Sequence, residues 1–175
     1  MTDATTDAAA DRGHDLADGQ VPDAGRLVDL EAIRALAIAY AGAVDDADWV
    51  RWQALFTPDA RIDYSSSGGI IGDPAEVGAW MPGAMSIFTW TMHSIYTHEI
   101  HFTGPDRAVG KVHLFNRNGV EWEGAAEILD IGGFYRDEYV RVGDTWRFAS
   151  RVEDTVYVDG GGFAAMLRDL IAKQA

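Results

Sequence analysis

The segment VDDADWVRWQALFTPDARIDY, residues 44–64, decides the fold because it links the end of one helix to a second helix and then to a strand. Upstream of it, apolar side chains recur at helical spacing over residues 30–44, which predicts a first helix ending near Asp45. Asp46 or Asp48 is a suitable N-cap for the short second helix. The letters TPDA predict a turn that ends this helix before a strand, RIDY.

The rest of the chain reads as a third helix, a long meander of strands and a closing helix. Asp73 as N-cap and Pro74 at the first helical position signal the third helix. Five strand-like segments follow, separated by the turn signals GPD, RNG, GG and VGD: residues 93–103, 107–117, 122–132, 134–142 and 146–158. Their connections are too short for helices, so the sheet should be mostly antiparallel. This order predicts an α+β fold in which a strongly bent sheet wraps around the N-terminal helices as a cone with one open end.

Composition narrows the class of protein. The chain has 175 residues, of which 47% are hydrophobic, and is the size of one domain. Residues 1–27 predict a disordered acidic tail, which leaves residues 28–175 as the domain. A net charge of −14 argues against nucleic acid and anionic membranes as partners. There are no cysteines, which excludes disulfides, thiolate metal sites and cysteine nucleophiles. The N-terminal residues lack the pattern of a secretion signal, so a cytoplasmic location is expected.

Among the histidines, His93 is the candidate base. His98 and His101 resemble a metal-binding HxxH pair, but positions three apart on a strand face opposite sides, so no metal site is expected. His93 lies among apolar and aromatic residues in WTMHSIYTHEI, where a hydrogen-bonded core histidine is the commoner case. A buried imidazole acts as a base when a carboxylate fixes its tautomer and stabilises its charged form. Asp45 is the candidate carboxylate, with capping of the second helix as the alternative.

Tyrosines and an arginine could complete a site. Tyr40 lies on the first helix shortly before Asp45, and Tyr64 shares a strand face with Ile62. Either phenol could donate a hydrogen bond to a substrate oxygen, although a core tyrosine with a satisfied hydroxyl is at least as common. Arg151 lies on the last strand. It is either an exposed arginine or a cavity residue that would hold an anionic leaving group.

Two segments resemble a known family. VDDADWVRWQALFTPDARIDY resembles the corresponding region of scytalone dehydratase through its acid, its DW pair and its RIDY strand. ILDIGGFYRDEYVRVGDTWRFASR, residues 128–151, resembles the late strands of hexachlorocyclohexane dehydrochlorinase. Both enzymes belong to the SnoaL-like branch of the NTF2-like superfamily. The resemblance covers roughly residues 28–158 and implies the cone-shaped, cystatin-like α+β fold.

The resemblance also implies roles for individual residues. Asp45 and His93 match the family's catalytic Asp and His, in which the His takes a proton from a substrate carbon. Arg151 matches the dehydrochlorinase arginine that assists the departing anion, and Tyr64 matches a dehydratase tyrosine. Tyr40 is placed as in a bile acid 7α-dehydratase. The substrate-binding residues implied are Ile62, Trp49, Tyr135, Asn116 and His113.

Departures from the family pattern argue against either exact substrate. Tyr40 stands where the dehydrochlorinase has a lysine, Ile62 replaces its pocket tryptophan, and Gly133 and Tyr135 replace a serine and an asparagine of the dehydratase. The resemblance implies a cofactor-free lyase, dehydratase-like, acting on a small hydrophobic carbonyl or aromatic molecule. The alternatives are an isomerase or cyclase of the ketosteroid isomerase or polyketide cyclase kind, and a non-catalytic ligand-binding module. A homotrimer is expected, with a homodimer as runner-up, and the final helix could be a lid.

Overall fold

The structure, a computed structural model, describes residues 22–174. The elements are α1 (Ala24–Asp45), α2 (Trp49–Ala54), β1 (Phe56–Asp63), the 3-10 helix η1 (Ser65–Ser67), β2 (Ile71–Gly72), α3 (Pro74–Met85), β3 (Phe88–Gly104), β4 (Arg107–Trp122), β5 (Ala125–Val142), β6 (Thr145–Gly160) and α4 (Gly162–Gln174). The strands form one sheet in the order β2-β1-β6-β5-β4-β3. All neighbours are antiparallel except β1 and β6, which are parallel. The predicted α+β class and mostly antiparallel sheet are confirmed.

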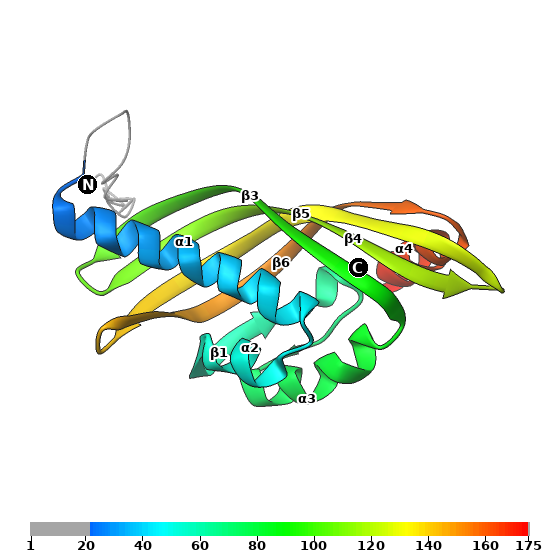
Figure 1. Ribbon diagram of the computed structural model, residues 1–175, viewed down its shortest axis with the longest axis horizontal. Helices are drawn as coiled ribbons and strands as arrows, with labels where there is room; N and C mark the ends of the chain where they lie inside the picture. The colour runs from blue at the N-terminus through cyan, green and yellow to red at the C-terminus, as the bar shows by residue number, and fades with distance from the viewer. Residues whose placement is uncertain (1–21, 175) are drawn as a thin grey trace, which may run out of the picture.

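Figure 1 shows the sheet as a long curved surface, with α1 running along one face and α2 and α3 gathered near the C-terminal end of α1. The main core lies between these helices and the sheet. Trp52, Phe56 and Phe148 are almost completely buried there, with successive ring centroids 4.8 and 5.1 Å apart. Burying an aromatic side chain of this size contributes about 1.5–3 kcal/mol. A second cluster, which includes Leu129 and Phe163, joins α4 to the far end of β4 and β5.

Helix α1 begins earlier than predicted. Asp23 is its N-cap and accepts a hydrogen bond from the backbone N–H of Arg26, so residues 24–27 belong to the helix and not to the acidic tail. The remainder of that predicted tail, residues 1–21, lies outside the described residues. Among the helices of residues 22–174, none combines the length and apolar character needed to cross a membrane.

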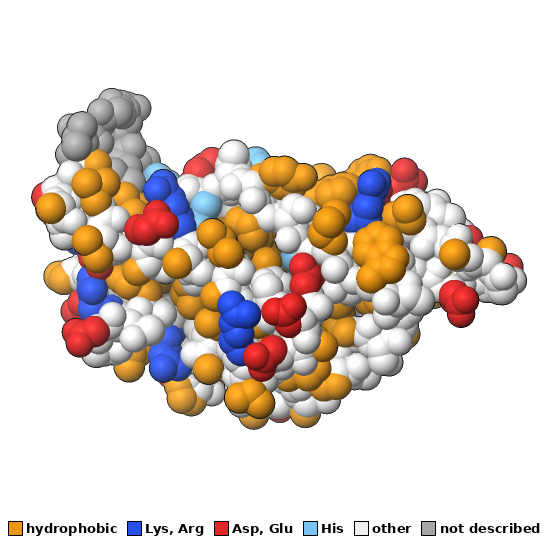
Figure 2. Space-filling model, viewed as in Figure 1, with side chains coloured by type: hydrophobic (Ala, Val, Ile, Leu, Met, Phe, Trp, Pro, Cys, Tyr) orange, Lys and Arg blue, Asp and Glu red, His pale blue; other side chains and the backbone are white. Residues whose placement is uncertain are grey.

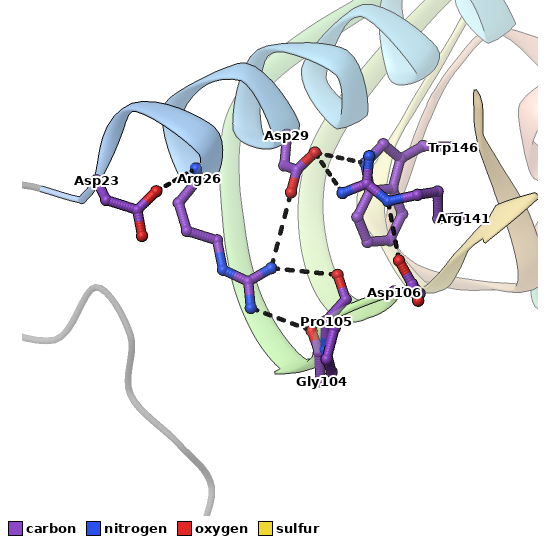
Figure 3. A network of polar contacts seen from close by, with 8 residues as sticks. All are labelled: Asp23, Arg26, Asp29, Gly104, Pro105, Asp106, Arg141 and Trp146. Atoms are coloured by element: carbon purple, nitrogen blue, oxygen red, sulfur yellow. Dashed lines mark hydrogen bonds and ion pairs between the residues drawn. The ribbon is translucent and has the colours of Figure 1, made fainter. Parts of the chain in front are cut away.

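A polar network joins the start of α1 to the turns that connect β3 to β4 and β5 to β6 (Figure 3). The buried Asp29 carboxylate accepts hydrogen bonds from Arg141 Nη2 at 2.6 Å and from Trp146 Nε1 at 3.1 Å. Arg26 reaches the carbonyl oxygens of Gly104 and Pro105. This network fixes the direction in which α1 crosses the sheet, and therefore where its other end lies.

Helices α2 and α3 begin where the sequence predicts. Asp73 is the N-cap of α3, and it forms a complete capping box with Glu76. Asp48 caps α2 and accepts a hydrogen bond from the backbone N–H of Arg51. The TPDA letters do not form a turn: they lie within β1, whose pairing with β6 is irregular between Phe56 and Arg61.

Two predicted turns in the meander are wrong. RNG lies inside β4 and GG lies inside β5, so the segments expected over 122–132 and 134–142 form one strand. A Cβ at Gly119 would collide with the Trp90 side chain, and one at Gly133 would collide with the backbone of Asp154. These glycines therefore permit close approach between strands and not chain reversal. The actual turn between β4 and β5 is at Glu123–Gly124, with φ of 51° and 81°.

Candidate active site

Asp45 and His93 meet where α1 ends against β3. Asp45 Oδ1 lies 2.6 Å from His93 Nδ1, and Asp45 Oδ2 accepts the backbone N–H of His93 at 2.9 Å. Thr91 Oγ1 donates a third hydrogen bond to the same carboxylate. Asp45 thus binds β3 instead of capping α2, which is the role of Asp48. The contact favours the His93 tautomer with hydrogen on Nδ1 and leaves Nε2 available for chemistry.

The same contacts keep Asp45 ionised. Burial raises the pKa of the Asp45 carboxyl, but the hydrogen bonds from the ring and backbone of His93 outweigh burial, so its pKa lies below the ordinary value. The Asp45 side chain is 27% exposed and the His93 side chain 8%. A stable carboxylate beside the ring can therefore stabilise an imidazolium when His93 takes up a proton.

His93 lines a cavity of about 460 Å³. Its walls are mainly apolar, and Trp80 of α3, Phe88 of β3 and Phe163 of α4 contribute large apolar aromatic side chains. Met166 and Leu170 of α4 also line it, which places that helix over the cavity. A mainly apolar cavity with a few polar groups is the usual form of a small-molecule site.

Three buried tyrosines form one polar part of the cavity wall. The hydroxyls of Tyr40 and Tyr64 are 2.7 Å apart, and the ring of Tyr135 lies edge-on to that of Tyr40 at 5.6 Å between centroids. Burial raises the pKa of all three phenols. They therefore stay protonated and can act as hydrogen-bond donors to a bound molecule.

Arg151 lies behind this tyrosine wall and does not line the cavity, contrary to the expected contact with a leaving anion. Its guanidinium is fully buried and donates two hydrogen bonds to Asp137, at 2.8 and 2.7 Å. The guanidinium carbon lies 4.1 Å from the ring centroid of Tyr40 and 4.0 Å from that of Tyr135. The charge of Arg151 is thus paired with a carboxylate, and its contact with the site runs through the tyrosine rings.

His98 belongs to the network behind the wall. Its Nε2 lies 2.9 Å from the Tyr139 hydroxyl, which donates to Asp137. Burial, the largest influence, lowers the pKa of His98 to about 4. His98 is therefore neutral at neutral pH.

The expected substrate-binding residues lie in three different places. Tyr135 and Asn116 line the cavity, and within the described residues the buried Asn116 Oδ1 has no hydrogen-bond partner. Ile62 is fully buried in the main core, and Trp49 packs against that core from α2. His113 lies in a separate shallow pocket, with its ring 4.6 Å from that of Phe134. Strand alternation turns His113 away from the cavity because its neighbour Leu114 fills the core.

Sequence reasoning missed Glu153, a second carboxyl in the cavity wall. It is buried, and its Oε2 accepts a hydrogen bond from Ser67 Oγ at 2.8 Å. Burial raises the pKa of Glu153, and Ser67 and the nearby His93 and Arg151 lower it only in part. The available signal was strand alternation: Glu153 is two residues beyond Arg151 and so shares its face of β6.

Comparisons with known proteins agree with this architecture. A model of the SnoaL-like domain matches residues 25–152. Uncharacterized proteins of Mycobacterium bovis and Mycobacterium tuberculosis are 31% identical over 121 residues, which is 69% of this chain and 81% of theirs.

Solved structures match the fold at lower identity. A protein from Kribbella flavida has a TM-score of 0.71 and 24% identity, over 82% of this chain and 99% of that one. A putative scytalone dehydratase from Novosphingobium aromaticivorans has a TM-score of 0.68 and 21% identity, over 77% and 88% of the two chains. A type 2 hexachlorocyclohexane dehydrochlorinase has a TM-score of 0.67 and 20% identity, over 77% and 90%.

Proposed function

The chain belongs to the SnoaL-like domain family, and we propose that it is a cofactor-free lyase of the dehydratase kind. His93 removes a carbon-bound proton from a small hydrophobic carbonyl or aromatic molecule, which then loses water or another leaving group. The observation that carries this proposal is the 2.6 Å contact between Asp45 Oδ1 and His93 Nδ1 at the wall of an apolar cavity. An oriented base of this kind typically contributes about 10²- to 10⁴-fold to the rate.

Tyr40 and Tyr64 would hold the substrate oxygen on which negative charge develops. Because their hydroxyls are hydrogen-bonded to each other, one phenol donates to its partner and the other keeps its proton for the substrate. Removal of the proton next to a carbonyl places charge on the carbonyl oxygen, and a pre-oriented donor at that oxygen stabilises the transition state.

The cavity favours an uncharged substrate. No lysine or arginine of residues 22–174 lines it, whereas Glu153 does, and the net charge of the chain is −14. Its volume of about 460 Å³ lies within the range of small-molecule sites. On the face that Figure 2 shows, basic side chains are separate spots among acidic and apolar ones, which agrees with a small molecule as the partner.

A screen of hydroxylated ketones and phenolic compounds, read by mass spectrometry, tests the reaction class. The proposal predicts a product that has lost water in the presence of the wild type but not of His93→Gln. A product of unchanged mass would indicate an isomerase or cyclase, because such enzymes also begin with proton abstraction. Saturable binding without any product would favour a ligand-binding module instead.

We also propose that the protein is a homotrimer, with a homodimer as runner-up. Large apolar residues remain exposed around the shallow pocket on β3 and β6: Tyr96, Val156 and Tyr157 are 64%, 68% and 46% exposed. Exposed apolar patches of this kind commonly mark protein interfaces. Light scattering coupled to gel filtration should give three times the monomer mass, and a monomer at all concentrations would contradict the assignment.

A further inference from the structure

We propose that Glu153 is the general acid of the reaction, the group that protonates the departing oxygen while His93 removes the carbon-bound proton. This inference rests on the proposed elimination function and adds the second proton transfer that loss of water requires. Hydroxide is a poor leaving group, so elimination of water needs a proton donor as well as a base.

Glu153 occupies a position suited to that task. It lines the same cavity as His93 but comes from β6, which β4 and β5 separate from β3 in the sheet. Sheet curvature brings the two residues to one cavity, close enough for the charge of His93 to affect the ionisation of Glu153. A substrate between them would meet a base on one strand and an acid on another.

Neighbouring hydroxyls hold Glu153 in place. Ser67 Oγ donates to Glu153 Oε2 at 2.8 Å, and Ser66 Oγ donates to the Glu153 backbone oxygen at 2.8 Å. Both serines belong to η1, which ends at Ser67 and is followed by Gly68 with a φ of 86°. This short element therefore orients the carboxyl, and Ser67 itself lines the cavity.

The two carboxyls near His93 have opposite environments. Hydrogen bonds to Asp45 outweigh its burial and hold its pKa below the ordinary value, whereas burial of Glu153 raises its pKa. Pairs of acids whose surroundings move their pKa values apart commonly divide the roles of base and acid. Asp45 is therefore the ionised partner of the base, and Glu153 is the carboxyl that can hold a proton.

The tyrosines are weaker candidates for this proton. Burial raises the pKa of Tyr40, Tyr64 and Tyr135 from a value that is already near 10, further from neutral pH. A catalytic acid works best when its pKa is near the operating pH. A buried carboxyl meets that condition better than a buried phenol, which suits the tyrosines to hydrogen bonding alone.

Both proton transfers use residues that line the cavity. His93 Nε2 takes the proton from the carbon, and the electron pair of that C–H bond forms the new C=C bond. The C–O bond breaks with its electron pair on oxygen, and Glu153 donates the proton that completes water. His93 is then protonated and Glu153 ionised, and transfer of one proton from His93 to Glu153 restores the starting state.

The protonation of Glu153 can be tested without a substrate. Infrared difference spectra between the wild type and Glu153→Gln at neutral pH should contain the carbonyl stretch of a protonated carboxyl that is absent from the variant. Asp154→Asn, the exposed neighbour on β6 that pairs with Arg136, is the matched control and should retain the band. If Glu153 is ionised at neutral pH in the wild type, the proposal is overturned.

Kinetics separate the acid from the base. Two probes are used. Benzylacetone reports deuterium exchange at the methylene carbon next to its carbonyl, and its β-hydroxy derivative reports loss of water. Glu153→Gln should reduce water loss by about 100-fold or more while reducing exchange far less. Equal reduction of both, or of neither, would overturn the role of Glu153. Exchange that survives in His93→Gln would instead overturn the proposed function and leave the infrared result intact.

Discussion

Asp45 holds His93 at two points, because its carboxylate accepts hydrogen bonds both from the imidazole ring and from the backbone N–H of the same residue, 48 positions along the chain. The first contact fixes the ring tautomer, and the second fixes where β3 passes the end of α1. Asp45 is thus both a partner of the proposed base and a structural link between helix and sheet. Substitution by Asn, which preserves its shape, is therefore a better probe than Ala.

The paired hydroxyls of Tyr40 and Tyr64 should contribute to turnover. Tyr40→Phe and Tyr64→Phe each remove one member of the buried hydrogen bond, so each should lower kcat/KM by about ten-fold or more and the free energy of unfolding by about 1 kcal/mol. Thr145→Val, which removes a hydroxyl from an exposed position at the start of β6, is the control and should change neither quantity. Unaltered kcat/KM in both cavity variants would exclude the phenols from the reaction.

The ion pair between Arg151 and Asp137 should matter for stability more than for chemistry. Both side chains are fully buried, so Arg151→Met leaves an unpaired carboxylate and should lower the free energy of unfolding by about 3–5 kcal/mol. The double variant Arg151→Met, Asp137→Leu should recover most of that loss, as measured by urea unfolding. A single Met variant with wild-type stability and no turnover would point instead to a direct role for Arg151 in catalysis.

Asp29 should make stability depend on acidity. Burial raises the pKa of Asp29, but hydrogen bonds from Arg141 and Trp146 outweigh burial, so its folded-state pKa is depressed. A depressed acid stabilises the fold above its unfolded pKa, about 3.9, and loses that contribution as the pH falls through the folded-state pKa. The Tm difference between the wild type and Asp29→Asn should therefore shrink as the pH falls below about 4. A difference that stays constant across this range would contradict this account.

Helix α4 should control access to the cavity. Met166 and Leu170 line the cavity yet are 37% and 41% exposed, so Met166→Ala and Leu170→Ala should raise KM several-fold with little change in Tm. Asp169→Ala, at an exposed position of the same helix, is the matched control. Truncation at Gly161 is a poorer test because it would also remove Phe163, which is buried in the second core cluster. A large fall in Tm with unchanged KM would show that these residues serve packing instead.

Local signals in the sequence predicted the elements whose causes are local. The capping box of α3 needs only Asp73 and Glu76, and the apolar periodicity before Asp45 is a property of one helix. The wrong turns had distant causes: Gly119 is required by the ring of Trp90, and Gly133 by the backbone of the neighbouring strand β6. No local pattern contains those contacts.

The same distinction between local and distant causes applies to the residues of the cavity and of the network behind it. The chain positions of Asp45 and His93, together with the family resemblance, were enough to nominate them. The burial of Arg151 depends on Asp137, fourteen residues away on the adjacent strand, and could not be read from a single strand. Glu153 was missed because a buried carboxyl is unusual, and only the packing of η1 against β6 reveals its surroundings.

The central claim is that His93, held by Asp45, removes a proton from carbon. Nuclear magnetic resonance of benzylacetone in deuterated buffer measures this step directly, as hydrogen–deuterium exchange at the methylene carbon next to the carbonyl. Wild-type protein should accelerate the exchange, and His93→Gln and Asp45→Asn should each slow it by about 100-fold or more while retaining the folded state. Exchange at the wild-type rate in folded His93→Gln protein would contradict the claim.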